Sequence, residues 1–131
     1  MQIKEDERSH YERIGGEDKV RELVLRFYHL MNELPETHGI RKMHADDLGS
    51  AENKLFMFLS GWMGGPQLFV EKFGHPRLRM RHLPFSIGES ERDQWMLCMT
   101  QALETVVVDV ALRNELNAAF YKVADFMRNQ N

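Results

Sequence analysis

The spacing of the apolar side chains constrains this sequence most, because it follows the period of an α-helix through nearly the whole chain. In the clearest stretch, between residues 17 and 34, one helix face carries Val20, Leu23, Val24, Phe27, Leu30, Met31 and Leu34. Pro35 ends this stretch, since proline cannot continue a helix. No segment of the sequence has a convincing strand pattern, and no internal repeat is present. The sequence therefore predicts an all-α fold.

Glycine and proline divide the rest of the sequence into further elements. A single helical turn is expected at residues 11–14 and a long helix at residues 48–62, and a glycine pair follows each of them. A short helix is expected at residues 76–82, since Pro84 disfavours helical geometry at the residue before it. Residues 36–47 are polar and irregular, and we expect a bend there.

The C-terminal part of the sequence predicts two more helices. Ser86 and Ser90 each precede a carboxylate by three residues, a pattern that is typical of a helix start. The apolar stripe of the first of these helices begins at Trp95. The β-branched run at residues 106–108 lowers helix propensity, and Asp109 is a candidate cap for the last helix.

The composition fits one globular domain. A chain of 131 residues has room for a single domain, which we assign to residues 11–131, with residues 1–10 as an N-terminal arm or short helix. The hydrophobic content of 43% is normal for a packed core, and a net charge of −3 gives no reason to expect nucleic acid or an anionic membrane as a partner. No run approaches the ~18 apolar residues of a membrane span, and the N-terminal residues lack the apolar region of a signal peptide. With Cys98 as the single cysteine, these features predict a soluble, cytoplasmic protein. Composition does not determine the oligomeric state, for which we expect a monomer or weak homodimer.

His82 is the most informative single residue, because it ends the short helix directly before a proline turn. A histidine in that position can direct its imidazole inward while a backbone carbonyl fixes the other ring nitrogen, as an axial haem ligand requires. A lone histidine before a turn is more commonly structural, so its position alone leaves both interpretations open.

Several other side chains could bind a ligand, although each also has an ordinary structural explanation. Tyr28 could donate a hydrogen bond into a cavity, or it could lie at the edge of the core with its hydroxyl in water. Trp95 could simply pack in the core, and His44 could be a solvated residue of the bend. Three basic residues could pair with the carboxylates of a ligand or could form a solvated face: Lys54, Arg79 and Arg81.

Four sequence segments, taken together, favour the ligand-binding interpretation of these residues over the structural one. They are YERIGG at residues 11–16, RFY at residues 26–28, GGP at residues 64–66 and GHPRLRMRHLPFSIGESERDQWMLCM at residues 74–99. In this order they resemble the truncated haemoglobins of the second group, over most of the chain. The last segment is the most specific, because one continuous match contains both His82 and Trp95.

This resemblance implies a shortened globin fold, in which two pairs of antiparallel helices enclose a non-covalently bound haem b. Within that family pattern, His82 corresponds to the proximal ligand of the iron, and Tyr28, His44 and Trp95 correspond to the polar residues of the distal side. The resemblance also makes Lys54, Arg79 and Arg81 the candidates to pair with the haem propionates. Besides Trp95, apolar contacts with the porphyrin are expected from Leu55, Phe58, Leu78, Phe85 and Ile87.

Three classes of function are compatible with the sequence. The first is a haem protein that reversibly binds oxygen, carbon monoxide and nitric oxide, with oxygen transport as one use. The second is an enzyme that detoxifies peroxide or nitric oxide. Because the sequence contains no reductase domain, nitric oxide turnover would need an unidentified external reductase. The third is a cofactor-free helical interaction module, which the segment at residues 74–99 makes remote.

Overall fold

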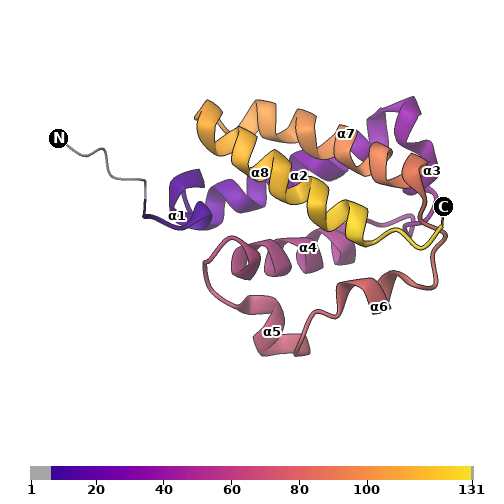
Figure 1. Ribbon diagram of the computed structural model, residues 1–131, viewed down its shortest axis with the longest axis horizontal. Coiled ribbons are helices and arrows are strands. Elements are labelled where there is room, and N and C mark those ends of the chain that lie inside the picture. The colour runs from indigo at the N-terminus through magenta and orange to yellow at the C-terminus, as the bar shows by residue number, and fades with distance from the viewer. Residues whose placement is uncertain (1–6, 131) are drawn as a thin grey trace.

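The computed structural model of the protein describes residues 7–130 and consists of helices joined by short connections (Figure 1). In chain order the elements are α1 (His10–Ile14), α2 (Glu17–Glu33), the 3₁₀ turn η1 (Pro35–Thr37), α3 (His38–Arg41), α4 (Gly49–Trp62), α5 (Leu68–Phe73), α6 (Leu78–His82), α7 (Glu89–Val106) and α8 (Val110–Phe126). Residues 7–130 contain no β-strand, so the predicted all-α fold is confirmed. Residues 1–6 of the predicted N-terminal arm lie outside the described residues. None of the helices within residues 7–130 combines the length and the apolar character that a membrane span requires.

The four long helices form two pairs that share one core. Helix α2 packs against α4 and α7 packs against α8, while α2 also packs along α7 (Figure 1). Large side chains that are fully buried fill the space between these helices, among them Leu23, Phe27, Met99, Leu103 and Leu116. The short helices α5 and α6 lie below α4 in Figure 1, and α6 leads the chain back toward α7. A cavity lies between α6 and the four long helices.

Helix α1 is anchored to the end of α4 by a close approach that requires glycine. The N–H of Tyr11 donates to the carbonyl of Met63 at 2.9 Å. A Cβ atom at Gly65 would collide with the Tyr11 ring, so a larger residue there would displace α1. Gly15, which ends α1, has a φ of 115°, a conformation that residues other than glycine rarely adopt. The glycine pairs at residues 15–16 and 64–65 therefore both lie where α1 packs against the end of α4.

The segment expected to be an irregular bend is more ordered than predicted. Residues 36–47 include most of η1 and all of α3, which the polar sequence did not suggest. The hydroxyl of the buried Thr37 donates to the carbonyls of Met31 and Leu34, both at 3.0 Å. The side-chain amide oxygen of Gln94 on α7 accepts a hydrogen bond from the N–H of Ile40 at 3.0 Å. Tertiary contacts, which local sequence patterns do not report, therefore stabilise these short helical turns.

Helix α5 was not predicted, and the start of α7 was predicted incorrectly. Helix α5 is held by the buried Phe69, whose ring lies 6.3 Å from that of Phe58 on α4. Helix α7 begins directly after Gly88, so neither of the two serines proposed as helix starts caps it. Instead, the carboxylate of Glu91 accepts a hydrogen bond from the N–H of Gly88 at 2.7 Å. Asp109 does cap α8, as predicted, by accepting from the N–H of Leu112 at 3.2 Å.

Candidate functional site

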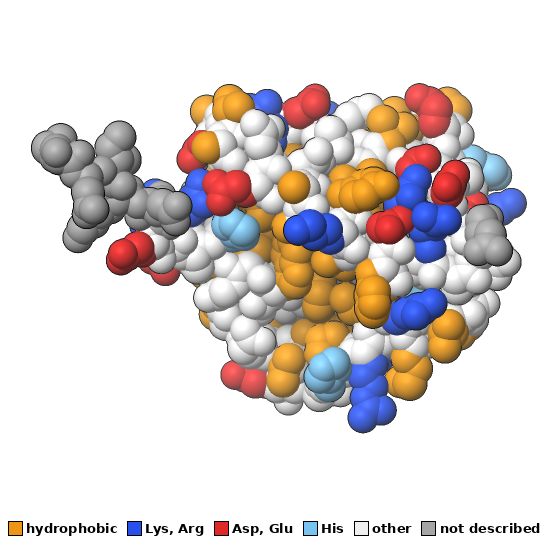
Figure 2. Space-filling view, in the orientation of Figure 1, with side chains coloured by type: hydrophobic (Ala, Val, Ile, Leu, Met, Phe, Trp, Pro, Cys, Tyr) orange, Lys and Arg blue, Asp and Glu red, His pale blue; other side chains and the backbone are white. Residues whose placement is uncertain are grey.

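A cavity of about 340 Å³ lies between α6 and the four long helices, and residues just after α3 complete it. Its apolar lining consists of Ile40, Met43, Leu55, Phe58, Leu78, Phe85, Ile87, Val123, Ala124 and Met127. Its polar lining consists of Tyr28, His44, His82, Glu91 and Trp95. Figure 2 shows apolar side chains gathered in a hollow between α8 and the α5–α6 segment. A mostly apolar cavity with a few polar groups is typical of a site for a small ligand or cofactor.

His82 is oriented by its own helix. Its Nδ1 lies 2.6 Å from the carbonyl oxygen of Leu78, which can only accept a hydrogen bond. Nδ1 therefore carries the proton, and in the neutral ring the lone pair is on Nε2. Because His82 also lines the cavity, this is the arrangement expected of a histidine that binds a metal through Nε2 while a carbonyl fixes its other nitrogen.

Tyr28 and Trp95 bring hydrogen-bond donors to the same cavity. Both line it, and neither the Tyr28 hydroxyl nor the Trp95 indole N–H has a hydrogen-bond partner within residues 7–130. Their rings are held by Phe27, whose centroid lies 5.0 Å from that of each ring. Burial, and to a smaller extent the charge of Glu52, raises the pKa of the Tyr28 hydroxyl well above its ordinary value. Tyr28 therefore keeps its proton and remains a donor at all physiological pH values.

His44 lies beside Tyr28 in the cavity wall. The two ring centroids are 5.8 Å apart in an edge-to-face arrangement. The Nδ1 atom of His44 lies 2.9 Å from the carbonyl oxygen of Ile40, so Nδ1 carries the proton. In the neutral ring Nε2 is then an acceptor, and His44 can donate from Nε2 only when the ring is protonated. The two histidines of the cavity are thus oriented in the same way, each by a backbone carbonyl of its own segment.

The three basic candidates do not line the cavity. Lys54 on α4 is exposed, as are Arg79 and Arg81 on α6. The Arg79 guanidinium lies 5.7 Å from the centre of the Phe126 ring. The Nε of Arg81 donates to the carbonyl of Pro76. The structure therefore places all three side chains at the surface, on helices that also contribute residues to the cavity wall.

The other candidates from the sequence come together. The five predicted apolar contacts all lie in the cavity wall, as do the three predicted polar residues and His82. Glu91 also lines the cavity, one turn before Trp95 on α7, and was not predicted from the sequence as a site residue. Met43, Val123 and the other lining residues of α8 were not predicted either. Glu91 could have been noticed from its spacing of four residues from Trp95, which places both on one helix face.

The sequence and the fold are similar to those of known globins. The family profile described as bacterial-like globin matches residues 9–129. Group 2 truncated hemoglobin YjbI of Bacillus subtilis is 37% identical over 121 residues, which are 92% of this chain and 88% of that protein. The solved structure of a cold-adapted truncated hemoglobin from the Antarctic marine bacterium Pseudoalteromonas haloplanktis superposes with a TM-score of 0.93 at 42% identity, covering 95% of this chain and all (100%) of that one. A group II 2-on-2 hemoglobin from Agrobacterium tumefaciens superposes with a TM-score of 0.92 at 41% identity, covering 98% of this chain and 100% of that one.

Proposed function

Since the chain belongs to the bacterial-like globin family, and within it to the group II truncated haemoglobins, we propose that it binds haem b non-covalently and uses it to bind oxygen reversibly. We propose His82 as the iron ligand. One observation carries this proposal: an oriented histidine and two unpartnered donors, Tyr28 and Trp95, line the same apolar cavity. Apart from His44 and Glu91, the remaining lining residues are apolar, which suits a flat apolar macrocycle.

The residues present fit a haem. Its iron requires an imidazole nitrogen with a free lone pair, which the hydrogen bond to Leu78 leaves on Nε2 of His82. The ring requires apolar contacts, for which we propose Leu55, Phe58, Leu78, Phe85, Ile87 and the indole of Trp95. The two propionates require cations near the surface, for which we propose Lys54, Arg79 and Arg81. When bound, haem supplies an iron that coordinates diatomic gases and shifts electron density onto them.

The protein contributes donors that favour such a ligand. The Tyr28 hydroxyl and the Trp95 indole N–H have no competing partner among residues 7–130, so both are free to donate to a ligand with partial negative charge. A hydrogen bond to a charged acceptor contributes roughly 1.5–3 kcal/mol, more than a bond between neutral groups. We infer that these donors slow the release of oxygen, and that carbon monoxide and nitric oxide bind at the same place. His44 adds a third donor only when its ring is protonated.

A detoxifying enzyme is the second candidate, and the carboxylate of Glu91 favours it. Glu91 lines the cavity, and one of its carboxylate oxygens accepts a hydrogen bond from the N–H of Gly88. Proton transfer near a haem would assist turnover of peroxide. Turnover of nitric oxide would further need an external reductase as partner.

We propose the reducing cytoplasm as the location of the protein. This location suits Cys98, because burial raises the pKa of its thiol to about 11 and keeps the thiol unreactive.

Repeated oxygenation of the reduced protein tests binding against catalysis. If the protein is an oxygen binder, its absorption spectrum should change on exposure to oxygen and return when argon removes the gas, over several cycles. Consumption of nitric oxide or peroxide should be measured in parallel, with free haem at the same concentration as the reference. Immediate and irreversible oxidation of the iron would contradict reversible binding. Turnover well above that of free haem would favour the enzyme.

A further inference from the structure

Residues 127–130, which follow α8, form a strap across the loop that joins α6 to α7. The N–H groups of Asn129 and Gln130 both donate to the carbonyl of Ile87, at 2.8 and 3.0 Å. The side chain of Asn129 continues this pairing, because its Oδ1 accepts from the N–H of Ile87 at 2.9 Å. Its Nδ2 donates to the carbonyl of Phe85 at 2.8 Å and reaches the carbonyl of His82 at 3.5 Å. One asparagine thus contacts the backbone of the proposed iron ligand and two backbone positions in the segment that follows it.

This segment has little other support. Helix α6 has five residues and is absent from the helix pairs that pack extensively within residues 7–130. Leu83 and Phe85 are exposed, at 57% and 41% of their full surface. Two further backbone hydrogen bonds close the turn locally, from Leu83 to Met80 at 3.3 Å and from Phe85 to His82 at 3.0 Å. Within residues 7–130, the hydrogen bonds that join residues 83–87 to another part of the fold therefore come from the tail.

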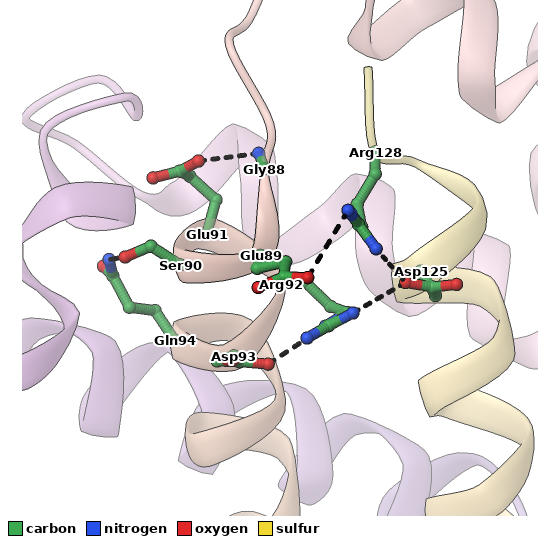
Figure 3. A network of polar contacts seen from close by, with 9 residues as sticks. All are labelled: Gly88, Glu89, Ser90, Glu91, Arg92, Asp93, Gln94, Asp125 and Arg128. Carbon is green, nitrogen blue, oxygen red and sulfur yellow. Dashed lines mark hydrogen bonds and ion pairs between the residues drawn. The ribbon is translucent and has the colours of Figure 1, made fainter. Parts of the chain in front are cut away.

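The base of the strap is fixed to the α7–α8 pair by charged groups (Figure 3). Asp125 near the end of α8 accepts from Arg92 of α7 at 2.8 Å and from Arg128 at 3.1 Å. Arg128 also lies 3.8 Å from the carboxylate of Glu89, in the first turn of α7. Because Arg128 directly precedes Asn129, this network determines where the strap starts. Asn129 therefore positions the loop relative to the two helices that carry Trp95 and the α8 wall of the cavity.

We propose that Asn129 is a positioning residue for His82. This inference rests on the proposed function. A primary amide can accept from one backbone group while it donates to another, which the Ile87 N–H and the Phe85 carbonyl require at once. By holding these two groups, Asn129 keeps the turn after α6 closed and the imidazole of His82 at a constant angle to the cavity. Supporting groups of this kind are known to tune a metal through its ligand.

Asn129→Ala, Asn129→Asp and the control Asn117→Ala test this proposal in the haem-loaded full chain. Asn117 is the matched control, because it accepts a hydrogen bond from Thr100 at 2.8 Å on the opposite part of α8 and does not line the cavity. The first readout is the iron–histidine stretching band in the resonance Raman spectrum of the reduced protein. The second is the rate of haem transfer to an excess of haem-free myoglobin. Neither readout should respond to a change that only lowers overall stability by a small amount.

Asn129→Ala should shift or broaden the iron–histidine band and accelerate haem loss by roughly 2- to 12-fold for each hydrogen bond removed. Asn129→Asp retains an acceptor for Ile87 but lacks the donor for Phe85, so it should give a partial effect. Asn117→Ala should leave both readouts as in the wild type. An unchanged band and an unchanged rate of haem loss in Asn129→Ala would overturn the proposal.

Hydrogen exchange of the haem-free chain separates this inference from the proposed function. The amides of residues 83–88 should exchange faster in Asn129→Ala than in Asn117→Ala, whether or not haem is present. If the wild type takes up no haem, the proposed function fails, and the positioning of His82 fails with it. If the wild type takes up haem but exchange in residues 83–88 is the same in both variants, only the role of Asn129 is refuted.

Discussion

Replacing Tyr28 by phenylalanine removes one donor from the cavity while leaving its shape nearly intact. The ring is 6% exposed and packs edge-to-face on Phe27 at 5.0 Å, and phenylalanine keeps that contact. The hydroxyl has no hydrogen-bond partner within residues 7–130, so its loss leaves no protein group unpaired. A hydrogen bond to a charged acceptor contributes roughly 1.5–3 kcal/mol, and about 1.4 kcal/mol corresponds to a factor of ten. Oxygen should therefore dissociate roughly 10- to 140-fold faster from Tyr28→Phe than from the wild type.

The assay is stopped-flow displacement of oxygen by excess carbon monoxide, followed by absorption. Tyr121→Phe is the matched control, because Tyr121 is 44% exposed on α8 and does not line the cavity; its rate should equal that of the wild type. Trp95→Phe should also accelerate release, since it removes the second unpartnered donor. Rates within a factor of two of the wild type in both Tyr28→Phe and Trp95→Phe would refute the assignment of these donors.

Two further predictions concern stability. Gly65→Ala should lower the free energy of unfolding by roughly 1–3 kcal/mol, because the added Cβ would collide with the Tyr11 ring. Unfolding in urea measures this free energy, and an unchanged value would mean that α1 does not pack against α4 as described. Because the pKa of Tyr28 is raised in the folded protein, the unfolded chain releases this proton at lower pH than the folded one does. The free energy of unfolding should therefore be unaffected by this group below pH ~10 and should fall as pH rises above that value. Tyr28→Phe should lose less stability than the wild type between about pH 9.5 and 11.5, and parallel curves would contradict the burial of this hydroxyl.

The long helices could be predicted because each has its own apolar stripe and its own end signal. The stripe from Val20 to Leu34 and the proline after it predict α2 to within a residue of its observed end at Glu33. Helix α5 lacks such a signal, since six residues between two glycine-containing turns are too few to establish a period. It forms because Phe69 is buried against Phe58, a contact between residues that the sequence alone does not bring together.

In the cavity, too, features with a local sequence signal could be predicted, and contacts between distant residues could not. The proline turn after His82 suggested that a backbone carbonyl would fix its ring, and the carbonyl of Leu78 does so. By contrast, no local pattern marks Asn129, a polar residue near the end of the chain whose partners lie more than forty residues earlier. The orientation of His44 was also beyond the sequence, because it depends on the α3 turn that the polar segment did not predict.

The absorption spectrum of His82→Gly beside the wild type tests the central claim most directly. Both proteins should be reconstituted with haem, reduced and exposed to carbon monoxide, with circular dichroism to establish that the variant is helical. The wild type should have a strong Soret band that shifts on carbon monoxide binding, and His82→Gly should lose haem or change its spectrum until free imidazole restores it. A wild type without a Soret band, or a folded variant with the spectrum of the wild type, would contradict the assignment of His82 as the residue that holds the iron.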